Sequence, residues 1–232
     1  MIETETLTLA TEQGRDLNAY LARPKRGKGP GVVVLHDMFG LNEPIRGIAD
    51  RCAARGFAAL VPNLFWRAAH PAAIPYDDDR HAQAWDRLKA LDLDVAARDI
   101  RLAVDWLRGQ DFVNGKIATV GFCGGGRLAF LAAARSGVDA AAALYGLGIS
   151  QHLGELGRIG CPLQLHYGLS DQHVSKAEID AVAADVRGHP GTEVFLYPQA
   201  GHSFANPMRP TYDATATAQA WSRIDAMLDK LR

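Results

Sequence analysis

Three side chains with complementary chemistry follow predicted strands of this sequence: Cys123, Asp171 and His202. The cysteine stands among glycines in GFCGGG, the aspartate lies in GLSDQHV, and the histidine lies in AGHSFA. An imidazole can activate a thiol as a nucleophile, and a carboxylate can orient that imidazole. The order nucleophile, acid, histidine along the chain is typical of three groups that meet at the carboxyl ends of parallel strands. We therefore predict covalent acyl-transfer chemistry.

The glycines around the thiol predict a sharp turn from a strand into a helix. Gly121 and Gly125 flank Cys123 in the pattern G-x-nucleophile-x-G, where a Cβ would collide with the neighbouring strand or helix. The N–H of Gly124 can then face an oxyanion, and the helix behind it favours the thiolate. A glycine-rich turn can instead bind the phosphates of a dinucleotide, but the G-x-G-x-x-G spacing is absent.

His202 is the strongest candidate for a base among the eight histidines, because it follows the last predicted strand. His173 is its nearest rival, but it lies only two residues from Asp171 and is poorly placed to span acid and nucleophile. An alternative role for Asp171 is an Asx turn or N-cap at the next helix, for which Ser175 is better placed. We expect the remaining loop and helix-surface histidines to take no part as the base: His70, His81, His152 and His189.

The elements that must position these groups alternate between strand and helix from residue 31 onward. Apolar runs such as GVVVLHDMFG predict strands buried on both faces, so the fold class is α/β, with a mostly parallel central sheet and helices on both faces. TLTLAT and NAYLARP predict two edge strands joined by a turn around Gly14. Further strands are expected at 57–64, 115–123, 139–146, 162–168 and 192–198. Helices are expected at 43–55, 81–108 with a break near DLD, 125–137, 175–187 and 212–231, and residues 63–80 predict an irregular excursion.

The composition and charge of the chain argue against several classes of function. The 232 residues carry a net charge of −1 with no long basic run, so we expect neither a nucleic-acid partner nor a membrane partner. No linker or composition shift divides the chain, which predicts a single domain over 1–232. The start MIETETLTLATEQG lacks the pattern of a signal peptide, and the unpaired set Cys52, Cys123 and Cys161 suits a reducing compartment, so we expect a cytoplasmic location. The run Asp77–Asp79 lacks calcium-loop spacing, and we expect no metal and no cofactor.

Four stretches together resemble the dienelactone hydrolase family, whose members have the α/β-hydrolase fold: HDMFGLN, GFCGGGRLAF, GLSDQHV and AGHSFA. The resemblance runs over roughly residues 30–230 in the right order. It implies Cys123 as nucleophile, His202 as base and Asp171 as its partner. It also implies that the backbone N–H groups of Met38 and Gly124 form the oxyanion hole.

The sequence departs from the family pattern near the substrate. Members usually carry a glutamate close to the resting thiol, where this chain has Asp37, which is one methylene shorter; its other possible role is a cap on the following helix. The family's two carboxylate-binding arginines correspond to Arg80 or His81 and to Asn206, with Arg209 three residues further on. We expect a weakened cationic clamp and a less acidic substrate. The expected substrate-binding residues are Phe39, Arg80, His81, Trp85 and Asn206.

The predicted reaction is hydrolysis of a small ester or lactone through a cysteine nucleophile, of the carboxymethylenebutenolidase type. Two alternatives stay open: a general carboxylesterase or thioesterase, and a ligand receptor without catalysis on the same fold. A third is a redox protein that uses the thiol, although no resolving cysteine stands out. The expected partner is the small-molecule substrate, and the chain is expected to be a monomer or weak oligomer.

Overall fold

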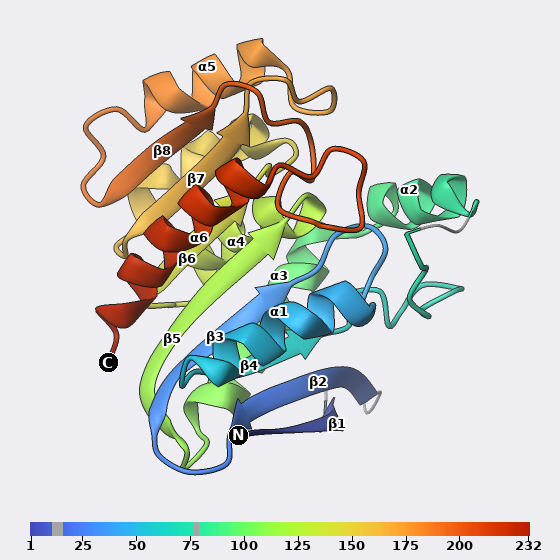
Figure 1. Cartoon of the computed structure of the whole chain (residues 1–232), viewed down its shortest axis with the longest axis vertical. Helices are drawn as coiled ribbons and strands as arrows, with labels where there is room; N and C mark the ends of the chain where they lie inside the picture. The colour runs from blue at the N-terminus through green and yellow to red at the C-terminus, as the bar shows by residue number, and fades with distance from the viewer. Residues whose placement is uncertain (11–15, 77–78) are drawn as a thin grey trace.

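The computed structural model describes residues 1–10, 16–76 and 79–232, and Figure 1 shows the arrangement of their elements. Within these ranges the strands form a single sheet in the order β1-β2-β4-β3-β5-β6-β7-β8. The strands are β1 (Ile2–Ala10), β2 (Asp16–Pro24), β3 (Gly29–Leu35), β4 (Ala58–Pro62), β5 (Val113–Phe122), β6 (Ala140–Leu144), β7 (Leu163–Gly168) and β8 (Thr192–Tyr197). The helices are α1 (Glu43–Ala54), α2 (His81–Lys89), α3 (Leu93–Arg108), α4 (Gly124–Arg135), α5 (Lys176–Asp185) and α6 (Ala214–Asp229), with a 3₁₀ helix η1 (Ile149–Arg158).

The sheet is parallel from β4 to β8 and antiparallel at one edge. β1 pairs antiparallel with β2, and β2 pairs antiparallel with β4, whereas each later neighbouring pair is parallel. The expected α/β class with a mostly parallel sheet is therefore confirmed. The turn expected around Gly14 lies outside the described residues.

Helices cover both faces of the sheet, as the β-branched runs predict. Val32 and Val34 of β3 belong to a buried cluster that includes residues of α1 and α6, whereas Val33 and Leu35 belong to a second cluster that includes residues of α3, α4 and α5. All four side chains are fully buried. This two-sided burial accounts for a continuous apolar strand in place of an alternating one.

The predicted long helix is two helices. Asp92 accepts hydrogen bonds from the N–H groups of Asp94 and Val95 and so caps a new helix, α3, close to the expected break. The 3₁₀ helix η1 was not predicted, because Gly154 and Gly157 interrupt the apolar spacing there. Figure 1 shows α2 beyond the carboxyl ends of β3 and β5, so this helix stands beside the expected site.

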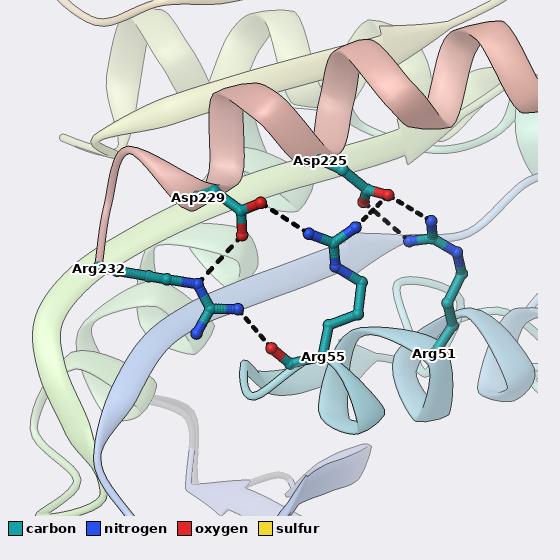
Figure 2. Close-up of polar contacts among 5 residues, drawn as sticks. All are labelled: Arg51, Arg55, Asp225, Asp229 and Arg232. Atoms are coloured by element: carbon teal, nitrogen blue, oxygen red, sulfur yellow. Dashed lines mark hydrogen bonds and ion pairs between the residues drawn. The ribbon is translucent and has the colours of Figure 1, made fainter.

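A network of arginines and aspartates joins α6 to α1 (Figure 2). Arg51 donates from both terminal nitrogens to the carboxylate of Asp225, at 3.0 and 2.6 Å. Arg55 pairs with Asp225 and with Asp229, and Arg232 pairs with Asp229. The network therefore attaches the last helix to the first one across a long sequence separation.

Within the described residues, none of the helices has the length and apolar character needed to cross a membrane. Within the same residues, no group of three or more His, Cys, Asp and Glu side chains is placed to hold a metal ion. Asp77 and Asp78 of the acidic run lie outside the described residues.

Candidate active site

Cys123 occupies a sharp turn between β5 and α4. Its backbone has φ 57° and ψ −119°, an unusual conformation for a residue with a Cβ. A Cβ on Gly121 would lie 1.9 Å from the carbonyl oxygen of Gly125, and a Cβ on Gly125 would lie 2.2 Å from that of Leu35. The predicted need for glycine at both positions is confirmed. The cysteine is 4 % exposed.

Backbone strain is concentrated at this end of the sheet. In the part of the chain that the structure describes, the non-glycine residues with positive φ are Cys123, Tyr145 and Ser203. Tyr145 follows β6 and its ring lies 5.1 Å from that of His202, and Ser203 comes directly after that histidine. Strained residues that cluster in this way are typical of functional sites.

Asp171 and His202 are in direct contact, each in a loop that follows a strand. Nδ1 of the imidazole lies 2.8 Å from Oδ2 of the carboxylate. The other oxygen, Oδ1, accepts the N–H groups of His173 and Val174 at 2.7 and 3.0 Å, and Ser175 caps α5. Asp171 therefore makes the Asx turn and the imidazole contact together, one with each carboxylate oxygen, and the N-cap of α5 is Ser175, which the sequence favoured for that role.

The electrostatics of this pair favour a charged imidazole. Burial alone would lower the pKa of His202, but Asp171 and then Cys123 outweigh it and raise that pKa to about 10. Burial would likewise raise the pKa of Asp171, but the His202 contact and two backbone N–H groups bring it below its usual value. Nε2 of His202 is buried and has no hydrogen-bond partner of normal geometry among the described residues. Because Nδ1 contacts Asp171 and the Cys123 thiol also raises the pKa of the ring, we infer that the thiol lies near Nε2.

The two expected oxyanion donors lie where β3 and β5 end. Gly124 is the first residue of α4, so its N–H has no acceptor within the helix. Among the described residues the N–H of Met38 has no backbone acceptor either. Both N–H groups are therefore available to a ligand.

Asp37 is buried against Tyr76. Its Oδ2 accepts the Tyr76 hydroxyl at 2.7 Å, and its Oδ1 accepts the N–H of Phe39 at 2.8 Å. Burial raises the pKa of the carboxyl, with Tyr76 and Phe39 opposing the rise. Asn42 caps α1, so the alternative role of Asp37 as a helix cap is wrong.

The expected substrate-binding residues divide into two groups. Phe39 packs edge-on against His81 at 5.2 Å, and Trp85 lies 5.5 Å from the ring of His173, which itself packs on His202. These aromatic contacts link α2 to the loops that carry Asp171 and His202. Arg80 is exposed at the start of α2, and Asn206 is buried with its side-chain oxygen bonded to the N–H of Met208.

The guanidinium of Arg209 lies near the aromatic rings beside Asp37. It lies 5.4 Å from the Phe39 ring and 5.9 Å from the Tyr76 ring, and its charge acts on Asp37 and His173. No carboxylate within the described ranges forms an ion pair with it. Its position three residues after Asn206 is the signal in the sequence, but the turn that brings it inward is not visible there.

A cavity of about 710 Å³ borders the site beside Asp37 and Tyr145. Most of its other lining is apolar and comes from α1, α6 and the loop after His202. The side chains concerned are Pro44, Ile45, Ile48, Phe122, Pro207, Met208, Tyr212 and Trp221.

Three further residues, Cys52, Cys161 and Arg127, do not belong to the group Cys123, Asp171 and His202. Cys52 and Cys161 are buried, and burial raises the pKa of each thiol, to about 12 and about 11. Arg127 forms no ion pair with any carboxylate that the structure describes, and burial lowers its pKa, with Cys123 and Glu178 opposing the shift.

Comparisons with known proteins identify the family of this chain. The model of the Dienelactone hydrolase family matches residues 17–231. The chain is 32 % identical to carboxymethylenebutenolidase from Pseudomonas putida, over 95 % of this chain and 94 % of the relative. It is 29 % identical to carboxymethylenebutenolidase 1 from Cupriavidus pinatubonensis, over 99 % and 98 %. A solved structure from Klebsiella pneumoniae shares the fold with a TM-score of 0.89 and 23 % identity, over 99 % of both chains.

Proposed function

The chain belongs to the dienelactone hydrolase family of ester and lactone hydrolases, and from this membership we propose that it hydrolyses a small ester or lactone through Cys123. His202 serves as the base and Asp171 orients it. The observation that carries the proposal is the 2.8 Å contact between Asp171 and Nδ1 of His202, which leaves Nε2 free for the sulfur.

In the first half of the reaction the thiolate of Cys123 attacks the carbonyl carbon. The N–H groups of Met38 and Gly124 stabilise the oxyanion that forms. Collapse of this intermediate breaks the bond to the leaving oxygen, which takes a proton from the His202 imidazolium. A thioester remains on the cysteine, and in a lactone the new hydroxyl or enol stays on the same acyl group.

In the second half water cleaves the thioester. Nε2 of His202 takes a proton from the water while its oxygen attacks the thioester carbon, and the same two N–H groups hold the second oxyanion. Collapse returns the thiolate and releases the acid. Because a thiolate expels a plain alkoxide poorly, activated esters and enol lactones are the favoured substrates.

Two classes of substrate, which differ in charge, are candidates. Arg209 beside Phe39 supports a carboxylate-bearing lactone such as those of the carboxymethylenebutenolidase relatives. The apolar cavity beside Tyr145 supports a neutral ester with an apolar group, the second candidate. Comparing kcat/KM for an acidic lactone and a neutral ester distinguishes them.

The test is turnover of p-nitrophenyl acetate and of a cis-dienelactone by Cys123→Ala. We expect activity to be lost, whereas Cys161→Ala, which removes another buried thiol, stays within a few-fold of wild type. Turnover by Cys123→Ala close to wild type would exclude the proposed nucleophile. If wild type turns over neither an acidic lactone nor a neutral ester, the proposal fails, and the receptor and redox alternatives are left.

A further inference from the structure

His36 is the first residue after β3 and stands directly before the segment that supplies one oxyanion donor. The side chain is 2 % exposed. Its ring packs on Phe65 with 5.0 Å between ring centroids. A buried polar ring must satisfy its nitrogens internally, so the two hydrogen bonds of His36 identify which nitrogen carries the proton.

The contacts of the ring fix one tautomer. The backbone N–H of Leu64 lies 3.0 Å from Nε2, and a backbone N–H can only donate, so Nε2 is the acceptor and carries no proton. Nδ1 therefore carries the proton and donates to the carbonyl oxygen of Asp37 at 2.8 Å. Burial lowers the pKa of this imidazole to about 4, which keeps the ring neutral in this form at neutral pH.

The carbonyl that His36 holds belongs to the same peptide group as the N–H of Met38. A trans peptide is planar, so its C=O and N–H point in opposite directions. A carbonyl fixed toward the His36 ring therefore turns the Met38 N–H away from it. The N–H of Gly40 also donates to this carbonyl at 3.1 Å.

The next peptide of the segment is fixed as well. Nε of Arg87 donates to the carbonyl oxygen of Met38 at 2.9 Å, and the N–H of Phe39 is bonded to the Asp37 side chain. Among the described residues the N–H of Met38 is thus left without a hydrogen-bond partner, whereas the groups on both sides of it are held. The segment also touches the nucleophile turn, since a Cβ on Gly125 would meet the carbonyl oxygen of His36 at 2.5 Å.

We propose that His36 is a positioning residue that, as the neutral Nδ1–H tautomer, holds the Asp37–Met38 peptide so that the Met38 N–H faces the developing oxyanion. This proposal rests on the proposed function. A donor that is fixed before the reaction needs no reorganisation when the charge forms, so its loss affects the chemical step more than substrate binding.

Three variants separate this role from a purely structural one. His36→Asn keeps a donor near the position of Nδ1 and loses the acceptor for Leu64. His36→Gln keeps an acceptor near the position of Nε2 and loses the donor to Asp37, and His36→Phe loses both. We expect kcat on p-nitrophenyl acetate to fall about 10- to 100-fold in the Gln and Phe variants, with KM within a few-fold. The Asn variant stays within a few-fold of wild type in kcat.

The stability of the variants should follow a different order from their activity, because the contact between His36 and Leu64 anchors the segment after β4. His36→Gln should unfold at a higher urea concentration than His36→Asn, although it is the less active of the two. If activity follows stability, or if KM rises while kcat is unchanged, His36 is structural only and the proposal is overturned.

A readout that needs no turnover separates this proposal from the proposed function. The ¹⁵N spectrum of the His36 ring in the resting protein should show a protonated Nδ1 and an unprotonated Nε2 at neutral pH. The opposite tautomer would exclude the role even if esterase activity is present. If the protein has the expected tautomer but its turnover does not depend on Cys123, the proposed function is wrong. The tautomer then has no role in catalysis.

Discussion

The hydroxyl of Tyr76 donates a 2.7 Å hydrogen bond to Oδ2 of Asp37, a carboxylate that is only 6 % exposed. The contact crosses from the excursion after β4 to the end of β3, and it gives the shorter acid of this chain a partner other than the thiol. Burial raises the pKa of Asp37 because it destabilises the charged carboxylate, and the hydrogen bond from the Tyr76 hydroxyl partly offsets this destabilisation.

Tyr76→Phe should therefore destabilise the protein by about 1–3 kcal/mol at pH 7, measured by urea unfolding. Because the folded pKa of Asp37 lies above its unfolded value, its contribution to stability is greatest at low pH and is lost as the pH rises. The variant raises that pKa further, so its deficit should be larger at pH 8 than at pH 4. Tyr20→Phe, which removes a more exposed contact to Asp50, should cost less. A deficit that is equal at both pH values would contradict an ionised, phenol-bonded Asp37.

Asp171→Asn keeps an oxygen for the N–H groups of His173 and Val174 but removes the charge beside His202. We expect kcat to fall about 10³- to 10⁴-fold. In wild type the raised pKa of His202 adds stability that is complete below pH 6.5 and is lost as the pH approaches 10. The stability gap between wild type and variant should therefore narrow from pH 6 to pH 10. Asp180→Asn, an exposed change on α5, is the control, and a gap that does not change with pH would contradict the charged pair.

Arg209→Gln tests which substrate the site binds. Loss of a charge-assisted contact to a carboxylate should lower kcat/KM for an acidic lactone about 10- to 100-fold, while a neutral ester is little affected. Arg80→Gln measures the other candidate cation in the same assay. Equal effects of Arg209→Gln on both substrates would show that this guanidinium supports the fold around Phe39 and does not bind substrate charge.

Asp225→Asn should weaken the attachment of α6 to α1. Asp225 is 15 % exposed and pairs with Arg51 and Arg55, so we expect a loss of about 1–2 kcal/mol. The loss should shrink at high salt because the arginines are partly exposed. Asp105→Asn in the exposed pair with Arg101 is the matched control and should cost less than about 0.5 kcal/mol. Equal losses in the two variants would mean that the network adds nothing beyond a surface pair.

The sequence was most informative where local rules determine the structure. Apolar runs identified the strands, the glycines around Cys123 identified the turn, and Asp92 marked the break between α2 and α3. Contacts between distant segments could not be predicted in this way. The bonds from Leu64 to His36 and from Tyr76 to Asp37 depend on how the excursion after β4 folds back. The inward position of Arg209 depends on a turn with no apolar period of its own.

The order of the sheet has a consequence for the growing chain. The thiol follows β5, the acid follows β7 and the imidazole follows β8, so the ribosome makes them in that sequence and at one advancing edge. A nascent or truncated polypeptide that stops before β8 carries Cys123 but lacks His202, the proposed base. In the proposed mechanism such fragments cannot cleave esters, and activity begins only when the segment after the last strand has been added.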